Sequence, residues 1–191
     1  MNEFKKFIET NKKTWNKRTP IHIKSNFYNN DEFIKGKNSL KSIELSAIGD
    51  VTEKSLLHLQ CHFGQDSISF ARMGAKVTAV DFSDVAVKEA KKLAKKINTH
   101  VNFIESNVLD LTLNKEFDIV FSSYGVIGWL PDLDMWAKTI ATHLKKGGLF
   151  LLTEFQILKS QIQNIDVFYV FHDQVGFLTL QVFQNFQMNC N

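Results

Sequence analysis

The sequence predicts an α/β fold in which helices cover both faces of a mostly parallel sheet. Short apolar runs alternate with helical patterns over residues 55–153, which is typical of strands joined by crossover helices. Most of these runs are too apolar to leave one face in solvent, as expected for a sheet covered on both sides. The chain has 191 residues, of which 44% are hydrophobic, and this is enough for one domain with a core.

The expected elements follow one another along this region. The predicted strands are short runs rich in apolar residues, at residues 55–59, 76–80, 101–105, 117–122 and 149–153. Helical patterns precede and separate them, at residues 39–48, 66–73, 84–96 and 130–144. We expect Gly74 to close the second helix, Ser83 to cap the third and Asp132 to begin the fourth, because these residue types favour helix ends.

The two ends of the chain differ from this central region. We expect residues 1–50 to form an N-terminal helical extension or a flap over a pocket, residues 51–154 the α/β core, and residues 155–191 an atypical tail of the same domain. The tail contains six Phe and seven Gln but only three charged side chains. Residues 167–171 and 177–183 can pair as a hairpin, whereas the composition equally fits a truncated or frameshifted product, whose open sheet edge would favour homo-oligomers.

Charge and cysteine content exclude several classes of function. The net charge of +3 is small and dispersed, so we expect no binding to nucleic acid. Two cysteines without metal-ligand spacing predict no disulfide framework, and His58, Cys61 and His62 lack a carboxylate that would complete a metal site. No apolar run reaches the roughly 18 residues of a membrane span. Charges also stand where a secretory signal would be apolar, so we expect a cytoplasmic protein with no membrane association.

Three loops follow the carboxyl ends of the predicted strands, where open parallel sheets bind ligands. They are residues 60–66, 81–83 and 122–128. Asp81 lies about 20 residues after the first loop, where a carboxylate can accept both hydroxyls of a ribose. Gln60 and His62 stand where a dinucleotide-binding loop would have glycine, which disfavours NAD. A nucleoside cofactor without phosphates, such as S-adenosylmethionine, is easier to reconcile with these residues.

Three sequence segments carry a resemblance to a known family. LLHLQCHFGQDSISFARMGAKVTAVDFS, FDIVFSSYGVIGWL and LKKGGLFLLTE resemble the motifs of class I S-adenosylmethionine-dependent methyltransferases, in a bacterial subgroup whose first motif reads LHLQCHFGQD. The resemblance implies a Rossmann-like fold, S-adenosylmethionine as cofactor and residues 51–154 as its binding core. His58, Gln60 and His62 depart from the broader superfamily, which has an acid and two glycines there, and the tail departs from its usual last strands.

The resemblance also implies roles for individual residues. The expected cofactor-binding residues are Gln60, Cys61, Gly64, Gln65, Asp66, Asp81, Phe82, Asn107, Val108 and Ser123. Tyr124 and Trp129 are candidates for the methyl-acceptor pocket. No catalytic residue is assigned, because in-line methyl transfer depends mainly on positioning; His62 or Tyr124 is the nearest base if the acceptor must lose a proton. The expected function is methylation of a small molecule, and the alternative is a catalytically impaired cofactor-binding or regulatory module.

Overall fold

The computed structural model describes residues 3–156 and 165–172, with the backbone alone for 155–156 and 165–172. Its elements are, in chain order, α1 (Glu3–Ile23), α2 (Asn30–Ile34), α3 (Ser42–Ile48), β1 (Ser55–Leu59), α4 (Gln65–Arg72), β2 (Lys76–Asp81), α5 (Asp84–Lys96), β3 (Asn102–Glu105), β4 (Phe117–Ser123), the 3₁₀ helix η1 (Ile127–Trp129), α6 (Leu133–His143), β5 (Leu144–Gln156) and β6 (Ile165–His172).

One six-stranded sheet organises these elements, in the order β3-β2-β1-β4-β5-β6. The first five strands are parallel to their neighbours, and β6 is antiparallel to β5. The strand order reverses between β1 and β4, so their carboxyl ends border the position where such sheets bind ligands. The predicted Rossmann-like α/β architecture is confirmed.

The sheet has a hydrophobic core on each face because neighbouring side chains of a strand point to opposite sides. In β1, Leu56 belongs to the core beneath α4 and α5, whereas Leu57 belongs to the core that contains Trp136 and Ile140 of α6. All five residues of β1 are buried. This explains why the central strands lack the polar alternation of a solvent-facing sheet.

Local capping sets the helices close to their predicted positions. The Ser83 hydroxyl accepts a hydrogen bond from the Ala86 amide and begins α5, and the Asp132 carboxylate does the same for Met135 in α6. Gly74 has a φ of 95°, the left-handed conformation expected after α4.

The fifth strand is longer than predicted. It begins at Leu144, so the residues expected to separate helix from strand belong to β5 itself. They are accommodated by a shift in register, since Phe117 pairs with Leu144 and Ile119 with Leu149. At its other end β5 continues to Gln156, where it pairs with Ile165 of β6.

The first half of the predicted hairpin between residues 167–171 and 177–183 is a strand, as expected. Residues 167–171 belong to β6, which pairs with β5. Residues 177–183 lie outside the described part of the chain. The first half of the tail therefore extends the sheet, because the open edge of β5 offers unpaired backbone groups to the next extended segment.

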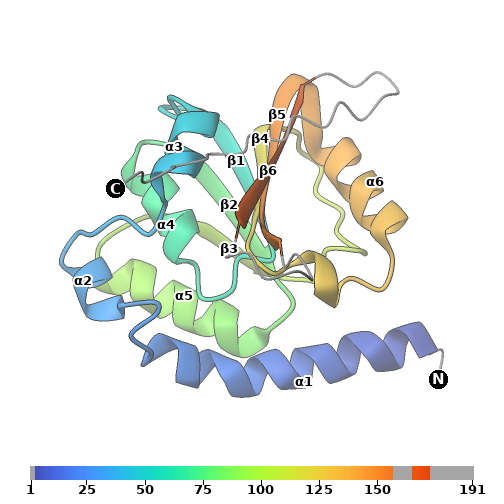
Figure 1. The fold of residues 1–191 in the computed structure, drawn as a ribbon, viewed down its shortest axis with the longest axis horizontal. Helices are drawn as coiled ribbons and strands as arrows, with labels where there is room; N and C mark the ends of the chain where they lie inside the picture. The colour runs from blue at the N-terminus through green and yellow to red at the C-terminus, as the bar shows by residue number, and fades with distance from the viewer. Residues whose placement is uncertain (1–2, 157–164, 173–191) are drawn as a thin grey trace, which may run out of the picture.

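Helix α1 lies outside the sheet and the helices that cover its two faces. It runs past the carboxyl ends of the strands, next to α5 (Figure 1). Its side chains reach the segments that follow β1, β2 and β4, through His22 to His62, Asn16 to Asp84 and Asn11 to the Trp129 carbonyl. None of the helices in the described residues is long and apolar enough to cross a membrane.

Candidate functional site

A cavity of about 370 Å³ opens at the carboxyl ends of β1, β2 and β4. The structure places all twelve residues predicted from the sequence around it: Gln60, Cys61, Gly64, Gln65, Asp66, Asp81, Phe82, Asn107, Val108, Ser123, Tyr124 and Trp129. Its size is at the lower end of the range for small-molecule sites, about 300–1,000 Å³. The cavity therefore has the volume of a small-molecule site.

The loop after β1 adopts a glycine-like conformation without the expected glycines. Gln60 and His62 have φ values of 58° and 52°, in the left-handed region that side chains disfavour. Gln60 spans the cavity wall, donating to the Val126 carbonyl at 3.3 Å and accepting from Ser122 at 3.4 Å. The Gln60 side chain thus connects the loop to β4 and to the segment that follows β4. These hydrogen bonds offset the cost of the left-handed backbone.

Asp81 is a buried carboxylate at the end of β2. Its oxygens accept hydrogen bonds from the backbone amides of His62 and Ser83, each at 2.8 Å. Burial raises its pKa to about 6, although these amides favour the ionised form. A carboxylate has about four acceptor positions, so Asp81 can still accept from a hydroxyl group in the cavity.

Gly64 is required by packing as well as by its φ of 81°. A Cβ atom there would lie 2.6 Å from the ring of Phe103 on β3. The chain must therefore pass close to Phe103 before α4 begins, and this brings Gln65 and Asp66 to the cavity wall. Gln65 turns its amide towards the N-terminal segment and donates to the Tyr28 carbonyl at 3.1 Å.

Asn107 and Val108 form the wall beyond β3. The Asn107 side chain stabilises its own turn, because it accepts from the Leu109 amide at 3.2 Å and donates to Asp110 at 3.0 Å. The amide oxygen has a second lone pair, which is available to a ligand in the cavity. Val108 supplies an apolar surface next to it.

The loop after β4 is held by an acid that the sequence analysis did not single out. The Glu154 carboxylate accepts from the backbone amides of Gly125, Val126 and Ile127. Glu154 stands at the carboxyl end of β5, one residue beyond the predicted end of that strand. An acid immediately after a buried strand was the available signal, since such positions face the ligand-binding edge of a parallel sheet.

Tyr124 begins this loop with a φ of 38°. Its hydroxyl is buried. Burial raises the pKa of Glu44, and a hydrogen bond from Tyr124 partly opposes this rise. The Lys41 ammonium lies 4.1 Å from the centre of the Tyr124 ring. Tyr124 thus contributes its ring to the cavity, and the buried hydroxyl argues against its use as a base.

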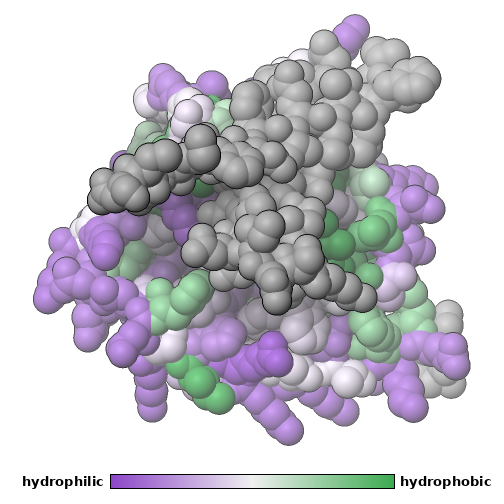
Figure 2. All heavy atoms as spheres, in the orientation of Figure 1, coloured by the Kyte–Doolittle hydropathy of each residue, from purple (hydrophilic) through white to green (hydrophobic). Residues whose placement is uncertain are grey.

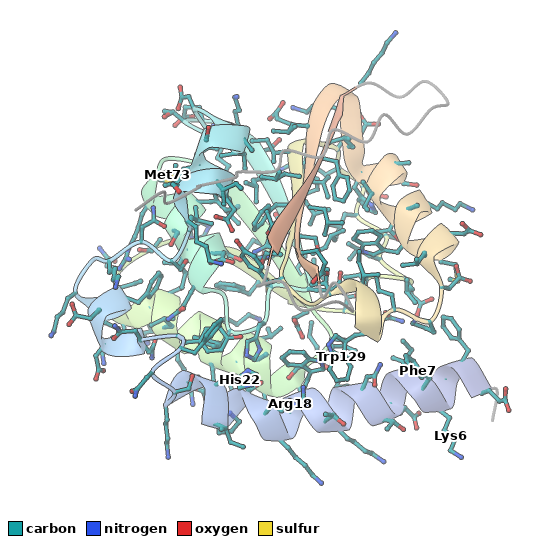
Figure 3. The ribbon with its side chains drawn as sticks, viewed as in Figure 1. Lys6, Phe7, Arg18, His22, Met73 and Trp129 are labelled. Carbon is teal, nitrogen blue, oxygen red and sulfur yellow. The ribbon has the colours of Figure 1, made fainter. Side chains whose placement is uncertain are left out.

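The N-terminal segment supplies a second group of cavity residues that the sequence did not predict: Ile8, Trp15, Phe27, Tyr28, Asn29, Phe33, Lys37, Asn38, Ser39 and Lys41. Trp15 of α1 meets Trp129 edge to face at 5.3 Å between ring centres. Arg18 and His22 also point from α1 towards the site, whereas Lys6 points away from it (Figure 3). The aromatic composition of residues 1–38 was the only indication that this segment could cover a pocket. Composition alone does not tell where each side chain lies in the fold.

His22 and His62 join the N-terminal segment to the first loop. His22 Nδ1 and His62 Nε2 are 3.1 Å apart, so one imidazole donates and the other accepts. Burial lowers the pKa of His62 to about 3, with a further contribution from His22. Burial also lowers the pKa of His22, helped by the charge of Arg18. A His62 ring that stays neutral to such low pH is a weak proton acceptor, which argues against its use as a general base.

His58 and Cys61 are buried beside the cavity loop. His58 Nδ1 lies 2.8 Å from the Ser67 hydroxyl, and burial lowers the pKa of His58 to about 4. Burial raises the pKa of the Cys61 thiol well above its usual value, which keeps the thiol neutral. Within residues 3–154, no three His, Cys, Asp or Glu side chains are grouped as metal ligands.

Comparisons of the sequence agree on one kind of domain. Residues 56–148 match a family described as "Methyltransferase domain". A ubiquinone biosynthesis O-methyltransferase of Pelagibacter ubique is 27% identical over 173 residues, covering 84% of this chain and 67% of the relative. Its counterpart from Rickettsia canadensis is 24% identical over 114 residues, covering 60% and 48%. The cypemycin N-terminal methyltransferase of a Streptomyces species is 31% identical over 102 residues, covering 52% and 41%. The chain spans about half the length of the last two relatives.

Solved structures share the architecture. The DhpI-SAH complex superposes with a TM-score of 0.63 at 17% identity and covers 82% of this chain and 72% of that chain. The PH0226 protein from Pyrococcus horikoshii OT3 gives a TM-score of 0.58 at 24% identity, covering 70% and 60%. At these identities the similarity establishes the fold alone.

Proposed function

We propose that the protein is a class I S-adenosylmethionine-dependent methyltransferase, as the match of residues 56–148 to a methyltransferase domain supports, and that it transfers the methyl group to a small molecule. The observation that carries the proposal is the buried Asp81 carboxylate in a cavity shared with all the other predicted cofactor residues. S-Adenosylmethionine supplies the electrophilic methyl group. The chain supplies binding, orientation and exclusion of water.

The donor set fits this cofactor. A ribose needs a hydrogen-bond acceptor, and Asp81 lines the cavity with acceptor capacity left on its carboxylate. An adenine ring needs flat apolar surfaces and a polar edge, for which Phe82, Val108 and Asn107 are available. The His62 amide already donates to Asp81, so it is not free to bind the pyrophosphate of a dinucleotide.

The remaining cavity residues form our proposed acceptor side. Tyr124 and Trp129 belong to the loop that Glu154 holds by its backbone amides, which fixes this wall relative to β5. A rigid wall suits a displacement in which the acceptor atom must lie in line with the methyl carbon, at ~3–3.5 Å. We also propose that residues 1–50 act as a flap, because Trp15 and Tyr28 cover the cavity from the N-terminal side.

Calorimetric titration with S-adenosylhomocysteine and with NAD tests the cofactor assignment. We expect S-adenosylhomocysteine to bind and NAD not to bind. Replacing Asp81 by Ala removes charge-assisted hydrogen bonds worth about 1.5–3 kcal/mol, so the affinity should fall at least tenfold. Asp134→Ala is the control, since this exposed acid in the first turn of α6 does not line the cavity. Equal affinities of Asp81→Ala and the unaltered protein would refute the assignment of the site.

A turnover assay separates an enzyme from a binding module. Release of S-adenosylhomocysteine with a panel of small acceptors is expected for the enzyme. Trp129→Ala should then raise the KM for the acceptor more than it weakens cofactor binding. Cofactor binding without turnover on any acceptor in the panel would favour the impaired module instead.

A further inference from the structure

Arg18 of α1 packs against the aromatic wall of the cavity. Its guanidinium carbon lies 5.2 Å from the ring centre of Trp129 and 5.8 Å from that of Trp15. Both indoles line the cavity, whereas Arg18 itself is exposed and points from α1 towards the site (Figure 3). The guanidinium therefore lies at the rim of the cavity, beside the wall that we propose for the methyl acceptor.

The two indoles hold a cation that has no acidic partner in the described part of the chain. A guanidinium over an aromatic ring is attracted by the negative face of that ring. Within residues 3–154, no carboxylate forms an ion pair with Arg18. Lys12, on the same helix, has two such partners. Arg18 is thus held by ring contacts, and the N–H groups at the edge of its guanidinium remain available to an anion.

The mouth of the cavity carries further positive charge. Among the described residues that line the cavity, Lys37 and Lys41 have ammonium groups, and both residues are exposed. The carboxylates of Asp66 and Asp81 also line it, but they accept hydrogen bonds from protein groups. A mouth with an excess of cations raises the local concentration of anions and speeds their entry.

We propose that Arg18 anchors an anionic group, a carboxylate or a phosphate, on the methyl acceptor. This inference rests on the proposed function, since it assumes that the acceptor lies against Trp129 while the cofactor is bound. A guanidinium presents its donors in one plane and can bind either anion through paired hydrogen bonds. The two indoles keep this plane oriented before the ligand arrives, which reduces the freedom lost on binding. The acceptor is then a small anion whose uncharged part packs on the tryptophan wall.

Titration of the protein saturated with S-adenosylhomocysteine tests this assignment with three small probes. Benzoate and phenyl phosphate carry the two anions, and benzamide is the neutral counterpart of benzoate. The NMR signals of the Trp15 and Trp129 indole N–H groups report binding at the rim, and Trp136 in the core is the internal reference. We expect at least one anion to bind about fivefold more tightly than benzamide, or better. The tighter of the two anions distinguishes a carboxylate site from a phosphate site.

Variants of α1 show whether Arg18 carries the preference. Arg18→Gln should weaken the tighter anion by about fivefold or more, and should change the affinities for benzamide and S-adenosylhomocysteine less than about twofold. Arg18→Lys keeps the charge without the planar donors, so it should retain part of the affinity for the anion. Lys17→Gln is the matched control, since it removes a neighbouring positive charge that neither lines the cavity nor lies over its tryptophans.

The outcomes separate this inference from the function on which it rests. Equal losses for the anion and benzamide in Arg18→Gln would show that Arg18 only holds α1 in place, and would overturn the assignment. A loss confined to S-adenosylhomocysteine would assign Arg18 to the cofactor and overturn it as well. Failure of both anions to bind the unaltered complex would have the same consequence. Absence of S-adenosylhomocysteine binding to the unaltered protein would instead overturn the proposed function, and this inference with it.

Discussion

Helices α1 and α5 lie side by side but are attached to the molecule in opposite ways. Five of the 13 residues of α5 are buried, and all five are apolar: Ala86, Val87, Ala90, Leu93 and Ala94. Only two of the 21 residues of α1 are buried, and both are polar: Asn11 and Thr19. Figure 2 shows mostly hydrophilic side chains along the outer side of α1. The core therefore holds α5, whereas α1 depends on contacts with the site itself.

Several contacts of α1 are polar and replaceable by water, beside the aromatic contacts of Trp15. The Lys12 ammonium lies 2.7 Å from Glu105 and 3.5 Å from Asp84, and Asn16 donates to Asp84 at 2.8 Å. Each such hydrogen bond contributes about 0.5–1.5 kcal/mol net, because water takes its place when it breaks. Burial of one large apolar side chain contributes about 1.5–3 kcal/mol. We therefore predict that α1 can leave the cavity at a cost that would not unfold the core.

The largest expected effect is the loss of stability when one apolar side chain is truncated in each helix. Leu93→Ala in α5 should lower the free energy of unfolding by about 3 kcal/mol, through lost burial and the cavity left behind. Ile8→Ala in α1 should lower it by about 1 kcal/mol, because this side chain is only half buried. Urea denaturation of both variants measures the contrast. Equal losses would show that α1 belongs to the core.

A fall in pH should weaken the contact of α1 more than it weakens α5. Burial lowers the pKa of His62 from 6.5 to about 3, so the folded protein keeps it neutral. The unfolded or opened chain takes up a proton below its ordinary pKa, so the stabilisation is complete above that value and is lost as the pH falls. Between pH 7 and pH 5 the α1 contact should weaken by about 2 kcal/mol.

Hydrogen exchange resolved by peptide measures this effect, with Glu3–Ile23 compared with Asp84–Lys96. Exchange in α1 should accelerate at pH 5, after correction for intrinsic rates, while α5 keeps its protection. His62→Asn should remove most of this pH dependence, since Asn tolerates a φ of 52°. His100→Asn, which alters an exposed histidine, is the control and should behave like the unaltered protein. A pH-independent α1 would contradict the role of the histidine pair.

The smallest effect concerns the ion pairs of α1. Lys12→Gln should lower the stability of the α1 contact by about 0.5 kcal/mol, because its partners Glu105 and Asp84 are half exposed. Salt should reduce the difference between the variant and the unaltered protein, as it screens exposed charges. Lys92→Gln in α5 is the matched control, since its pair with Glu89 lies within one helix. An undiminished effect of Lys12→Gln at 1 M salt would point to packing by its aliphatic chain.

The sequence predicted the central elements well because their signals are local. The burial of β1 and the Ser83 cap of α5 depend on neighbouring residues, and both were placed correctly. The extent of β5 was missed because it depends on two partners, the bulge against β4 and the pairing with β6. These contacts join segments that are far apart in the sequence, so no local sequence pattern predicts them.

The residues of the candidate site also differ in whether the sequence alone could locate them. Asp81 and Asp66 could be located because the carboxyl ends of parallel strands share one edge of the sheet. Trp15 and Tyr28 could not, since their place in the cavity depends on where α1 docks. Glu154 lies between these cases: its position after a buried strand was visible, but its hydrogen bonds to the next loop required the structure.

Glu154 also links the site to the edge of the sheet. Its carboxylate binds amides of the loop after β4, while its backbone pairs with Val167 of β6. A ligand that orders this loop should therefore strengthen the pairing of β6, and a change in that pairing should alter the affinity for the ligand by the same factor. The last described strand would then act as an effector built into the chain, and a peptide or partner strand competing for the edge of β5 would be an inhibitor that never enters the cavity.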